Sequence, residues 1–285
     1  MPAPFVVDLC GFRDGRPTTS DASAPISVEL GRVFFEKLGV PLEKEAVKNV
    51  DKVWAKAMVA DLSAQLASVA PHLAIEPEQS LEDFEQYAHL KAARDLAADD
   101  ASLEVDHALQ RLASDSDMSV DTRELLQDLQ GAMHDLDIRR RSLVDLLWDE
   151  SPLRLDVAAH RTLNLHGDAE VTHLVAGFSL KWSLRTDRLQ DPRTQGAKMA
   201  AMRRGRMPHF AAVTMEPRPY MLGRLGMGLG DLDCVYHLHL PALTASVDEV
   251  LAERRYRKQR ETFHRMIDQR RLRDYDELVG YLATL

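Results

Sequence analysis

The spacing of apolar residues along the chain changes near residue 130. Upstream, apolar positions recur every three to four residues in segments of helical length. We expect helices over residues 26–40, 48–73, 81–100 and 120–130. Residues 11–25 are rich in Gly, Pro, Ser, Thr and Asp and are expected to form an irregular arm. The pattern therefore predicts a mainly helical N-terminal region.

Downstream, apolar residues alternate with polar ones or form short runs, which is typical of strands. The expected strands are LDIR (136–139), LRLDVAAH (153–160), VTHLVAGFSLKWSL (171–184), PHFAAVTME (208–216) and DCVYHLHL (233–240). Between two of them, residues 190–206 carry an early proline followed by Ala, Met and Arg, which suggests a helix. These elements predict an α/β fold in which helices flank a central mixed β-sheet.

Composition is that of a globular protein, because 285 residues with 45% hydrophobic content can fill a core. The two cysteines, Cys10 and Cys234, are too few for a disulfide framework and too far apart in sequence to suggest a zinc site. They favour a reducing, cytoplasmic location. No secretory signal pattern and no apolar run of about 18 residues stands out, so neither secretion nor membrane insertion is expected.

Charge is distributed unevenly along the chain. The net charge of -9 argues against indiscriminate binding to nucleic acid. Residues 181–206 nevertheless hold eight Lys or Arg against two Asp, a local balance of +6. A second basic run covers residues 254–273, while acidic residues concentrate in 73–150. This polarity is expected of a protein with one anion-binding face.

Lys181 stands on an otherwise apolar expected strand, two residues after Ser179, so both side chains share one face. Taken alone, such a lysine is more often an edge residue whose ammonium reaches solvent. Metal-dependent phosphodiester hydrolysis needs a carboxylate to hold Mg²⁺ and a positive group near the attacking water. Asp137, on the expected LDIR strand, supplies such a carboxylate, although the spacing by itself is weak evidence.

Three charged residues, Arg185, Asp187 and Arg188, follow this lysine strand. A guanidinium donates bidentately to guanine O6 and N7, and a carboxylate accepts from cytosine N4. The R-x-D-R pattern therefore has the chemistry to read adjacent G·C pairs in a major groove. A solvated surface cluster is the simpler interpretation and, taken alone, the more frequent one.

Residues 179–243 together resemble the core of the NgoMIV-type restriction endonucleases, relatives of the PD-(D/E)-x-K nucleases. The resemblance rests on KWSLRTDR (181–188), RRGRMPH (203–209) and DCVYH (233–237), with a weaker likeness at QYAHL (86–90). It implies a restriction-endonuclease-like core and a Mg²⁺-dependent type II restriction endonuclease. Such an enzyme cuts double-stranded DNA at a CCGG-containing palindrome and leaves 5′-phosphate ends.

The resemblance also implies roles for individual residues. Lys181 falls on the active-site lysine and Ser179 on the serine before it. Arg185, Asp187 and Arg188 fall on the triad that reads the CCGG core. Asp21 falls on an aspartate that reads a base pair outside the core, which makes GCCGGC the first site to test. Arg203 and Arg204 are candidate phosphate contacts, with a solvated basic face as the equal alternative.

For the metal-binding aspartate, Asp137 is preferred because LDIRRRS resembles the family's P-D-I strand, and Asp135 and Asp156 compete with it. Two positions depart from the family pattern. Gln195 stands where the family has a metal-binding glutamate, and Ala55 where it has a glutamate on an early helix. An amide brings no charge to a Mg²⁺ site. These departures leave open a catalytically weak or inactive protein that binds its DNA sequence on the same fold.

A palindromic target requires a two-fold symmetric protein, so at least a homodimer is expected. The resemblance further implies a homotetramer of two back-to-back dimers. The expected organisation is a single domain over 1–285, with a mainly helical region (1–130), a catalytic and DNA-reading core (131–245) and a C-terminal helical segment (246–285). A third interpretation is an unrelated interaction protein with a basic face, which would not distinguish CCGG from scrambled duplex.

Overall fold

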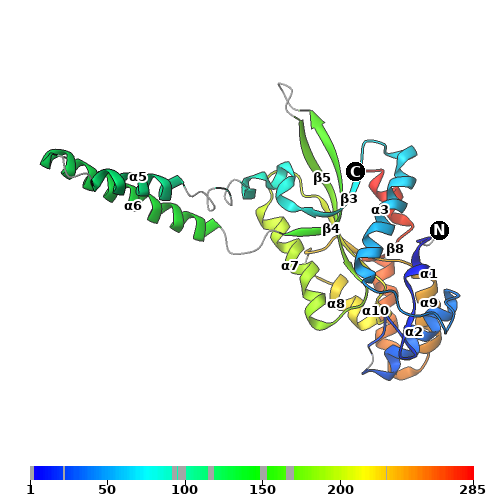
Figure 1. Ribbon diagram of the computed structural model, residues 1–285. Coiled ribbons are helices and arrows are strands. Elements are labelled where there is room, and N and C mark those ends of the chain that lie inside the picture. Colours follow the sequence, from blue (N-terminus) through cyan, green and yellow to red (C-terminus); the bar gives the residue numbers. More distant parts are fainter. Residues whose placement is uncertain are drawn as a thin grey trace. The chain divides into compact units, whose positions relative to one another are not determined.

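The computed structural model describes residues 3–21, 23–91, 95, 101–114, 119–147, 153–164, 170–228 and 230–285 (Figure 1). Within these ranges the side chains of residues 101–103, 143–147, 186 and 187 lie outside the description. The chain forms two compact units. The larger comprises Met1–Gln86 and Leu153–Leu285, and the smaller comprises Tyr87–Pro152. The boundary expected at residue 130 falls inside the smaller unit.

A six-stranded mixed sheet forms the centre of the larger unit, with the strand order β3-β4-β5-β6-β7-β8. The strands are β3 (Ala74–Ser80), β4 (Arg154–Asn164), β5 (Glu170–Lys181), β6 (His209–Thr214), β7 (Cys234–His237) and β8 (Leu272–Asp274). The β3-β4 and β4-β5 pairs are antiparallel, whereas the pairs from β5 to β8 are parallel. The predicted α/β class with a mixed sheet flanked by helices is confirmed.

The four parallel strands end together. Lys181 pairs with Thr214, Thr214 with His237, and His237 with Asp274. The loops that follow these strands therefore leave the sheet at one edge, which is where open α/β sheets commonly bind ligands. This register brings the loop after β5, with its charged R-T-D-R sequence, next to the loop after β6.

Helices cover both faces of the sheet (Figure 1). α3 (Val50–Val69) packs against β3, β4 and β5, and its buried residues recur mainly at four-residue spacing: Trp54, Met58, Leu62 and Leu66. α7 (Thr186–Met202) and α8 (Pro219–Gly226) connect parallel strands on the other side and pack on β6 and β7. The remaining helices of this unit are α1 (Val6–Leu9), α2 (Pro25–Lys37), α9 (Leu240–Val250), α10 (Arg257–Asp268) and α11 (Glu277–Leu282). A short hairpin of β1 (Phe12–Arg13) and β2 (Arg16–Pro17) interrupts the N-terminal arm.

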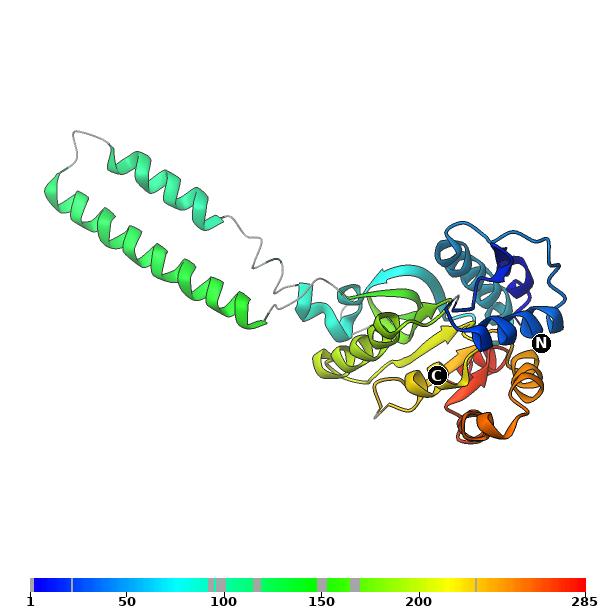
Figure 2. The same ribbon diagram turned by 90° about the horizontal axis from the view of Figure 1, so that it is seen from below.

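The smaller unit contains a helical hairpin of α5 (Ala101–Ala113) and α6 (Val120–Leu147), which lie side by side in Figure 2. The strand expected at residues 136–139 is wrong, because these residues lie inside α6. Asp137 accepts from Arg140 at 2.9 Å and pairs with Arg141 at 2.7 Å. Contacts at these spacings of three and four residues stabilise a helix.

Most other predicted elements are confirmed. The expected strands at 153–160, 171–184, 208–216 and 233–240 correspond to β4, β5, β6 and β7. The helix begun at residue 120 runs on to residue 147, and β3 was not predicted. Residues 81–87 form short 3-10 turns rather than the start of an α-helix. In the described part of the chain, no helix has the length and apolar character that a membrane span requires.

Candidate active site and recognition pocket

Asp156 and Ser179 meet between the neighbouring strands β4 and β5. The antiparallel register pairs Val157 with Phe178, which places Asp156 opposite Ser179. The backbone amide of Leu180 donates to Asp156 Oδ2 at 2.6 Å, and Ser179 Oγ lies 3.5 Å from the same oxygen. Asp156 was an alternative to Asp137 in the sequence, and the strand register brings it to the serine that precedes the lysine.

Lys181 is the last residue of β5, so its ammonium reaches the sheet edge where the parallel strands end. Its Nζ lies 3.8 Å from Asp191 Oδ2 on α7, and its side chain is 20% exposed. Its positive charge favours the ionised form of Asp156. Asp156, Ser179 and Lys181, which we call the cleavage site, therefore form one electrostatically connected group.

Burial is the largest influence on Asp156 and raises the pKa of its carboxyl group above the ordinary value. The negative charge of Asp51, in the first turn of α3, raises this pKa further. The Leu180 amide, the Lys181 ammonium and the Ser179 hydroxyl act in the opposite direction but do not cancel the effect. A cation bound at Asp156 would offset the cost of burying its charge.

The residues at this edge fit a Mg²⁺ ion whose coordination is completed by substrate and water. The described residues contain no group of three or more His, Cys, Asp or Glu side chains that could hold a metal ion. Mg²⁺ is commonly bound by one or two carboxylates together with substrate phosphates. Asp156 would be the principal ligand, with Asp51 or Asp191 as the neighbouring acid.

Gln195 belongs to α7 and reaches the start of β4. Its Nε2 donates to the carbonyl oxygen of Arg154 at 2.5 Å, two residues before Asp156 along the strand. A glutamate could not make this donation, so the amide at this position has a structural partner of its own.

Ala55 is buried within α3 and offers no polar atom. Asp51, one turn earlier on the same helix, was missed in the sequence. The four-residue spacing from Ala55 was the signal that could have identified it.

A second group of charged residues gathers in a pocket of about 570 Å³ beside the sheet edge. Asp21, Arg185, Arg188 and Arg218 all line it, and we call it the recognition pocket. Arg185 precedes α7 and Arg188 lies in its first turn, whereas Asp21 comes from the N-terminal arm. The structure thus brings three of the predicted DNA-reading residues together. The fourth, Asp187, lies in the first turn of α7, and its side chain lies outside the description.

Glu216, which was not predicted from the sequence, binds two residues that line this pocket, Leu184 and Arg218. The side chain is completely buried and accepts from the Leu184 amide at 2.7 Å. It also accepts from the amide of Arg218 at 3.0 Å and from Arg218 Nε at 2.6 Å. Burial raises the pKa of Glu216 despite these bonds. An acid two residues before an arginine, just after a buried strand, was the available signal.

Arg218 connects the N-terminal arm to the loop after β5. Its Nη2 donates to the carbonyl oxygen of Leu184 at 2.6 Å, and its Nη1 lies 3.0 Å from Asp21 Oδ2. Asp21 also accepts from the hydroxyl of Ser23 at 2.7 Å, and this bond is the largest cause of its lowered pKa. The loop after β5, the loop after β6 and the N-terminal arm are therefore connected through one guanidinium.

The other predicted site residues lie elsewhere. Arg203 and Arg204 are exposed at the C-terminal end of α7, about 25 Å along the helix from its start at 1.5 Å per residue. Arg203 donates to the carbonyl oxygen of Ala200, and neither arginine lines the recognition pocket. Asp137 and the competing Asp135 lie in α6 of the smaller unit, not on a strand beside that of Lys181.

Comparison with known proteins identifies relatives of this chain. A family model described as NgoMIV restriction enzyme matches residues 72–283. The type II restriction enzyme NgoMIV of Neisseria gonorrhoeae is 31% identical over 204 residues, which cover 70% of this chain and 63% of the relative. The chain thus matches just under two thirds of that relative's length. The family match includes the cleavage site and residues 185–188, while Asp21 and Asp51 precede it.

Proposed function

The chain belongs to the NgoMIV restriction enzyme family, and on this premise we propose that it is a Mg²⁺-dependent type II restriction endonuclease. The proposed substrate is double-stranded DNA that carries a CCGG-containing palindrome. The observation that carries the proposal is the bond from the Leu180 amide to Asp156, which places a buried carboxylate beside Ser179 and next to Lys181. The recognition pocket begins within four residues of that lysine.

In this proposal Asp156 replaces Asp137 as the metal-binding aspartate. When bound there, Mg²⁺ would supply Lewis-acid stabilisation of the scissile phosphate. Lys181 holds the attacking water by a hydrogen bond and places a positive charge beside the phosphate. The Ser179 hydroxyl and the Leu180 amide fix the orientation of Asp156. Attack of water on phosphorus, with the 3′ oxygen leaving, gives 5′-phosphate and 3′-hydroxyl ends.

The recognition pocket supplies the proposed base contacts. Arg185 and Arg188 donate to guanines of the core, and Asp187 accepts from cytosine. Asp21, held beside Arg218, reads the pair outside the core, which makes GCCGGC the proposed site. Each half of a palindrome needs the same reader, so the working enzyme is at least a homodimer, with a tetramer of two dimers as the extended proposal. Two buried free cysteines accord with action in the cytoplasm.

A sequence-specific DNA-binding protein that does not cleave is the second candidate. The observation in its favour is that Gln195 brings an amide in place of a carboxylate and donates to the carbonyl oxygen of Arg154. The described residues also contain no preassembled group of three metal ligands.

The test uses duplexes with GCCGGC, with ACCGGT and with a scrambled site, each incubated with and without Mg²⁺. Cleavage of the GCCGGC duplex only with Mg²⁺ is the expected result. Specific binding of GCCGGC without strand scission at high enzyme would establish the second candidate. Equal treatment of all three duplexes would overturn both.

A further inference from the structure

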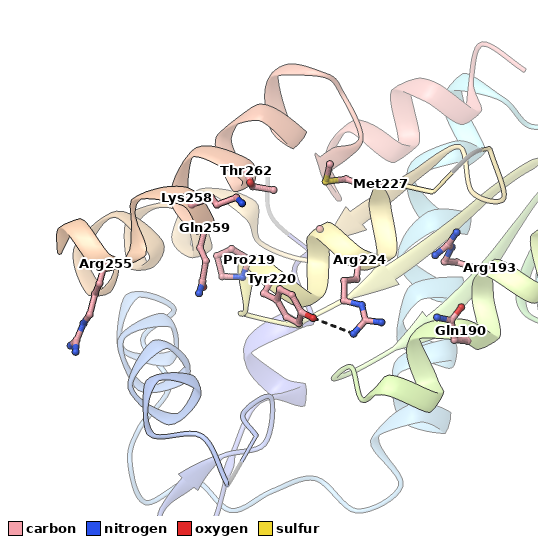
Figure 3. Close-up of a pocket in the computed structure, with 11 residues that line it drawn as sticks. Gln190, Arg193, Pro219, Tyr220, Arg224, Met227, Arg255, Lys258, Gln259 and Thr262 are labelled. Atoms are coloured by element: carbon pink, nitrogen blue, oxygen red, sulfur yellow. Dashed lines mark hydrogen bonds between the residues drawn. The ribbon is translucent and has the colours of Figure 1, made fainter.

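A groove with a basic lining lies between α7, α8 and α10, and none of its lining residues belongs to the cleavage site. It measures about 690 Å³. It shares no lining residue with the recognition pocket, although α7 contributes residues to both. Figure 3 shows Arg255 and Gln259 on one side, Gln190 and Arg193 on the other, and Tyr220 with Arg224 between them. The basic C-terminal run seen in the sequence supplies its α10 side.

The charge of this groove opposes that of the chain as a whole. Its described lining includes four cations, Arg193, Arg224, Arg255 and Lys258, and no Asp or Glu, on a chain of net charge -9. Such a concentration of one sign favours a polyanionic partner. The exposed side chains of Tyr220 and Met227 add apolar surface among these cations.

Contacts within the protein hold two of the arginines in place. Arg193 pairs with Asp231 through Nε at 3.0 Å and Nη2 at 2.9 Å. Arg224 lies 5.7 Å from the centre of the Tyr220 ring and donates to the Tyr220 hydroxyl at 3.2 Å. Fixed guanidiniums lose little side-chain entropy when they meet phosphate oxygens. Arg255 pairs with Glu253 at 3.0 Å, so the positive charges of Arg193 and Arg255 are both partly offset by a neighbouring acid.

The groove and the recognition pocket lie on different sides of α7. Successive residues of a helix are rotated by about 100°, which places Gln190 and Arg193 on the side of α7 opposite Arg188. Arg188 lines the recognition pocket, while Gln190 and Arg193 line the groove. A helix end inserted into a major groove about 12 Å wide has a phosphate backbone on either side.

We propose that this groove binds the sugar-phosphate backbone of the duplex outside the CCGG core, with Arg224 and Lys258 as its principal phosphate contacts. The inference rests on the proposed function, because it takes α7 as the helix that meets DNA. A second copy of the chain is a poorer occupant, since the same basic patch on both partners would repel.

The test compares two double variants that remove the same charge. R224Q/K258Q removes two groove cations. R257Q/K37Q removes one Arg and one Lys from exposed ion pairs with Glu261 and Glu249, outside both the groove and the recognition pocket. Binding to GCCGGC duplexes of about 10 and about 30 bp is measured without Mg²⁺ across a salt series, and thermal unfolding checks that each variant is folded.

For the longer duplex we expect R224Q/K258Q to lower the slope of log K against log salt by about 1.8, since each lost phosphate contact removes about 0.9. The control and the short duplex should change little. Equal slopes for both variants would overturn the proposal, as would a change of oligomeric state in R224Q/K258Q without a change of slope. A scrambled long duplex separates backbone binding by the groove from the proposed recognition of GCCGGC. If the groove binds the backbone, the two variants should differ in slope on the scrambled duplex even if wild type shows no preference for GCCGGC.

Discussion

The cleavage site and the recognition pocket adjoin each other but are stabilised differently. The cleavage site rests on strand register, with Asp156, Ser179 and Lys181 fixed by the pairing of β4 with β5. The recognition pocket is formed by loops that a single buried carboxylate, Glu216, ties together through Arg218. The first has few acids and a buried charge that a metal would neutralise. In the second, Arg218 is already paired with Asp21 and Glu216.

Because the two sites are stabilised by different contacts, the two proposed functions should separate on mutation. Changes at the cleavage site should remove strand scission and leave binding intact, because neither Asp156 nor Lys181 lines the pocket that holds the proposed base-reading residues. Changes in the recognition pocket should weaken discrimination between sequences and leave the chemistry of a bound site intact.

The largest expected effect is at Lys181. K181A should lower single-turnover cleavage of GCCGGC by about 10²–10³-fold, because it removes a positive group beside the developing charge on phosphate. Binding without Mg²⁺ should stay within a few-fold of wild type. K37A, at an exposed lysine paired with Glu249, is the matched control and should cut normally. An equal loss of DNA binding and of cleavage in K181A would show that the two sites do not act separately.

Next in size is the effect of R188A on specificity. Loss of one bidentate guanine contact costs about 1–3 kcal/mol of discrimination, or about 5–150-fold. The affinity for GCCGGC should fall by that factor while the affinity for scrambled duplex changes little. R257A, at an exposed arginine outside the pocket, is the control. A uniform loss on both duplexes would show that Arg188 contacts only phosphate.

Mg²⁺ dependence should shift with pH because the pKa of Asp156 is raised. The carboxylate must be ionised to hold the metal, so the Mg²⁺ concentration for half-maximal rate should rise about tenfold per pH unit below that pKa. The rise should begin at a higher pH than for an ordinary aspartate.

Rising pH favours metal binding at Asp156 but lowers the stability of the metal-free protein. A raised pKa means that the metal-free protein gains least from Asp156 above that pKa and most below the ordinary one. A half-maximal Mg²⁺ concentration that began to rise at no higher pH than expected for an ordinary aspartate would contradict this account of Asp156.

A smaller effect is expected for E216Q. The amide keeps the shape of Glu216 but loses its ion pair with Arg218, and a hydrogen bond to a charged group contributes about 1.5–3 kcal/mol. Discrimination at the base pair outside CCGG should fall about tenfold, as measured by competition between GCCGGC and ACCGGT duplexes. Discrimination within the core should persist. Equal losses at both positions, together with a lower unfolding temperature, would indicate a general structural role instead.

The smallest predicted change concerns Gln195. Q195E places a carboxylate against the carbonyl oxygen of Arg154 in place of a donor. Without metal it should lower the free energy of unfolding by about 1 kcal/mol, measured by denaturant titration. Mg²⁺ should recover part of this loss if the new carboxylate reaches the metal. Unchanged stability in metal-free buffer would show that the bond to Arg154 contributes little.

Local sequence patterns predicted most of the sheet. β4, β5, β6 and β7 are short apolar runs between polar connectors, and their prediction is confirmed. β3 was missed because AIEPEQS contains a proline and exposes most of its residues. The C-terminal segment was predicted to be helical, and α10 within it buries Phe263 and Met266.

The choice among the aspartates depended on information that no local pattern holds. LDIR and RLDV offer the same Leu-Asp-β-branched sequence, and only the strand register places Asp156 opposite Ser179. The pairing of Asp137 with Arg140 and Arg141 belongs to a helix, so it removes the local case for a strand. Asp51 and Glu216 act through contacts distant in sequence, which explains why both were missed.

Comparing D156N with D137N under identical conditions tests directly whether Asp156 or Asp137 is the metal-binding aspartate. Both substitutions replace one carboxylate by an amide of the same shape. If Asp156 is the metal-binding aspartate, D156N should bind GCCGGC without cutting it in Mg²⁺, while D137N should cut at nearly the wild-type rate. Normal cleavage by D156N together with loss of cleavage in D137N would contradict the account.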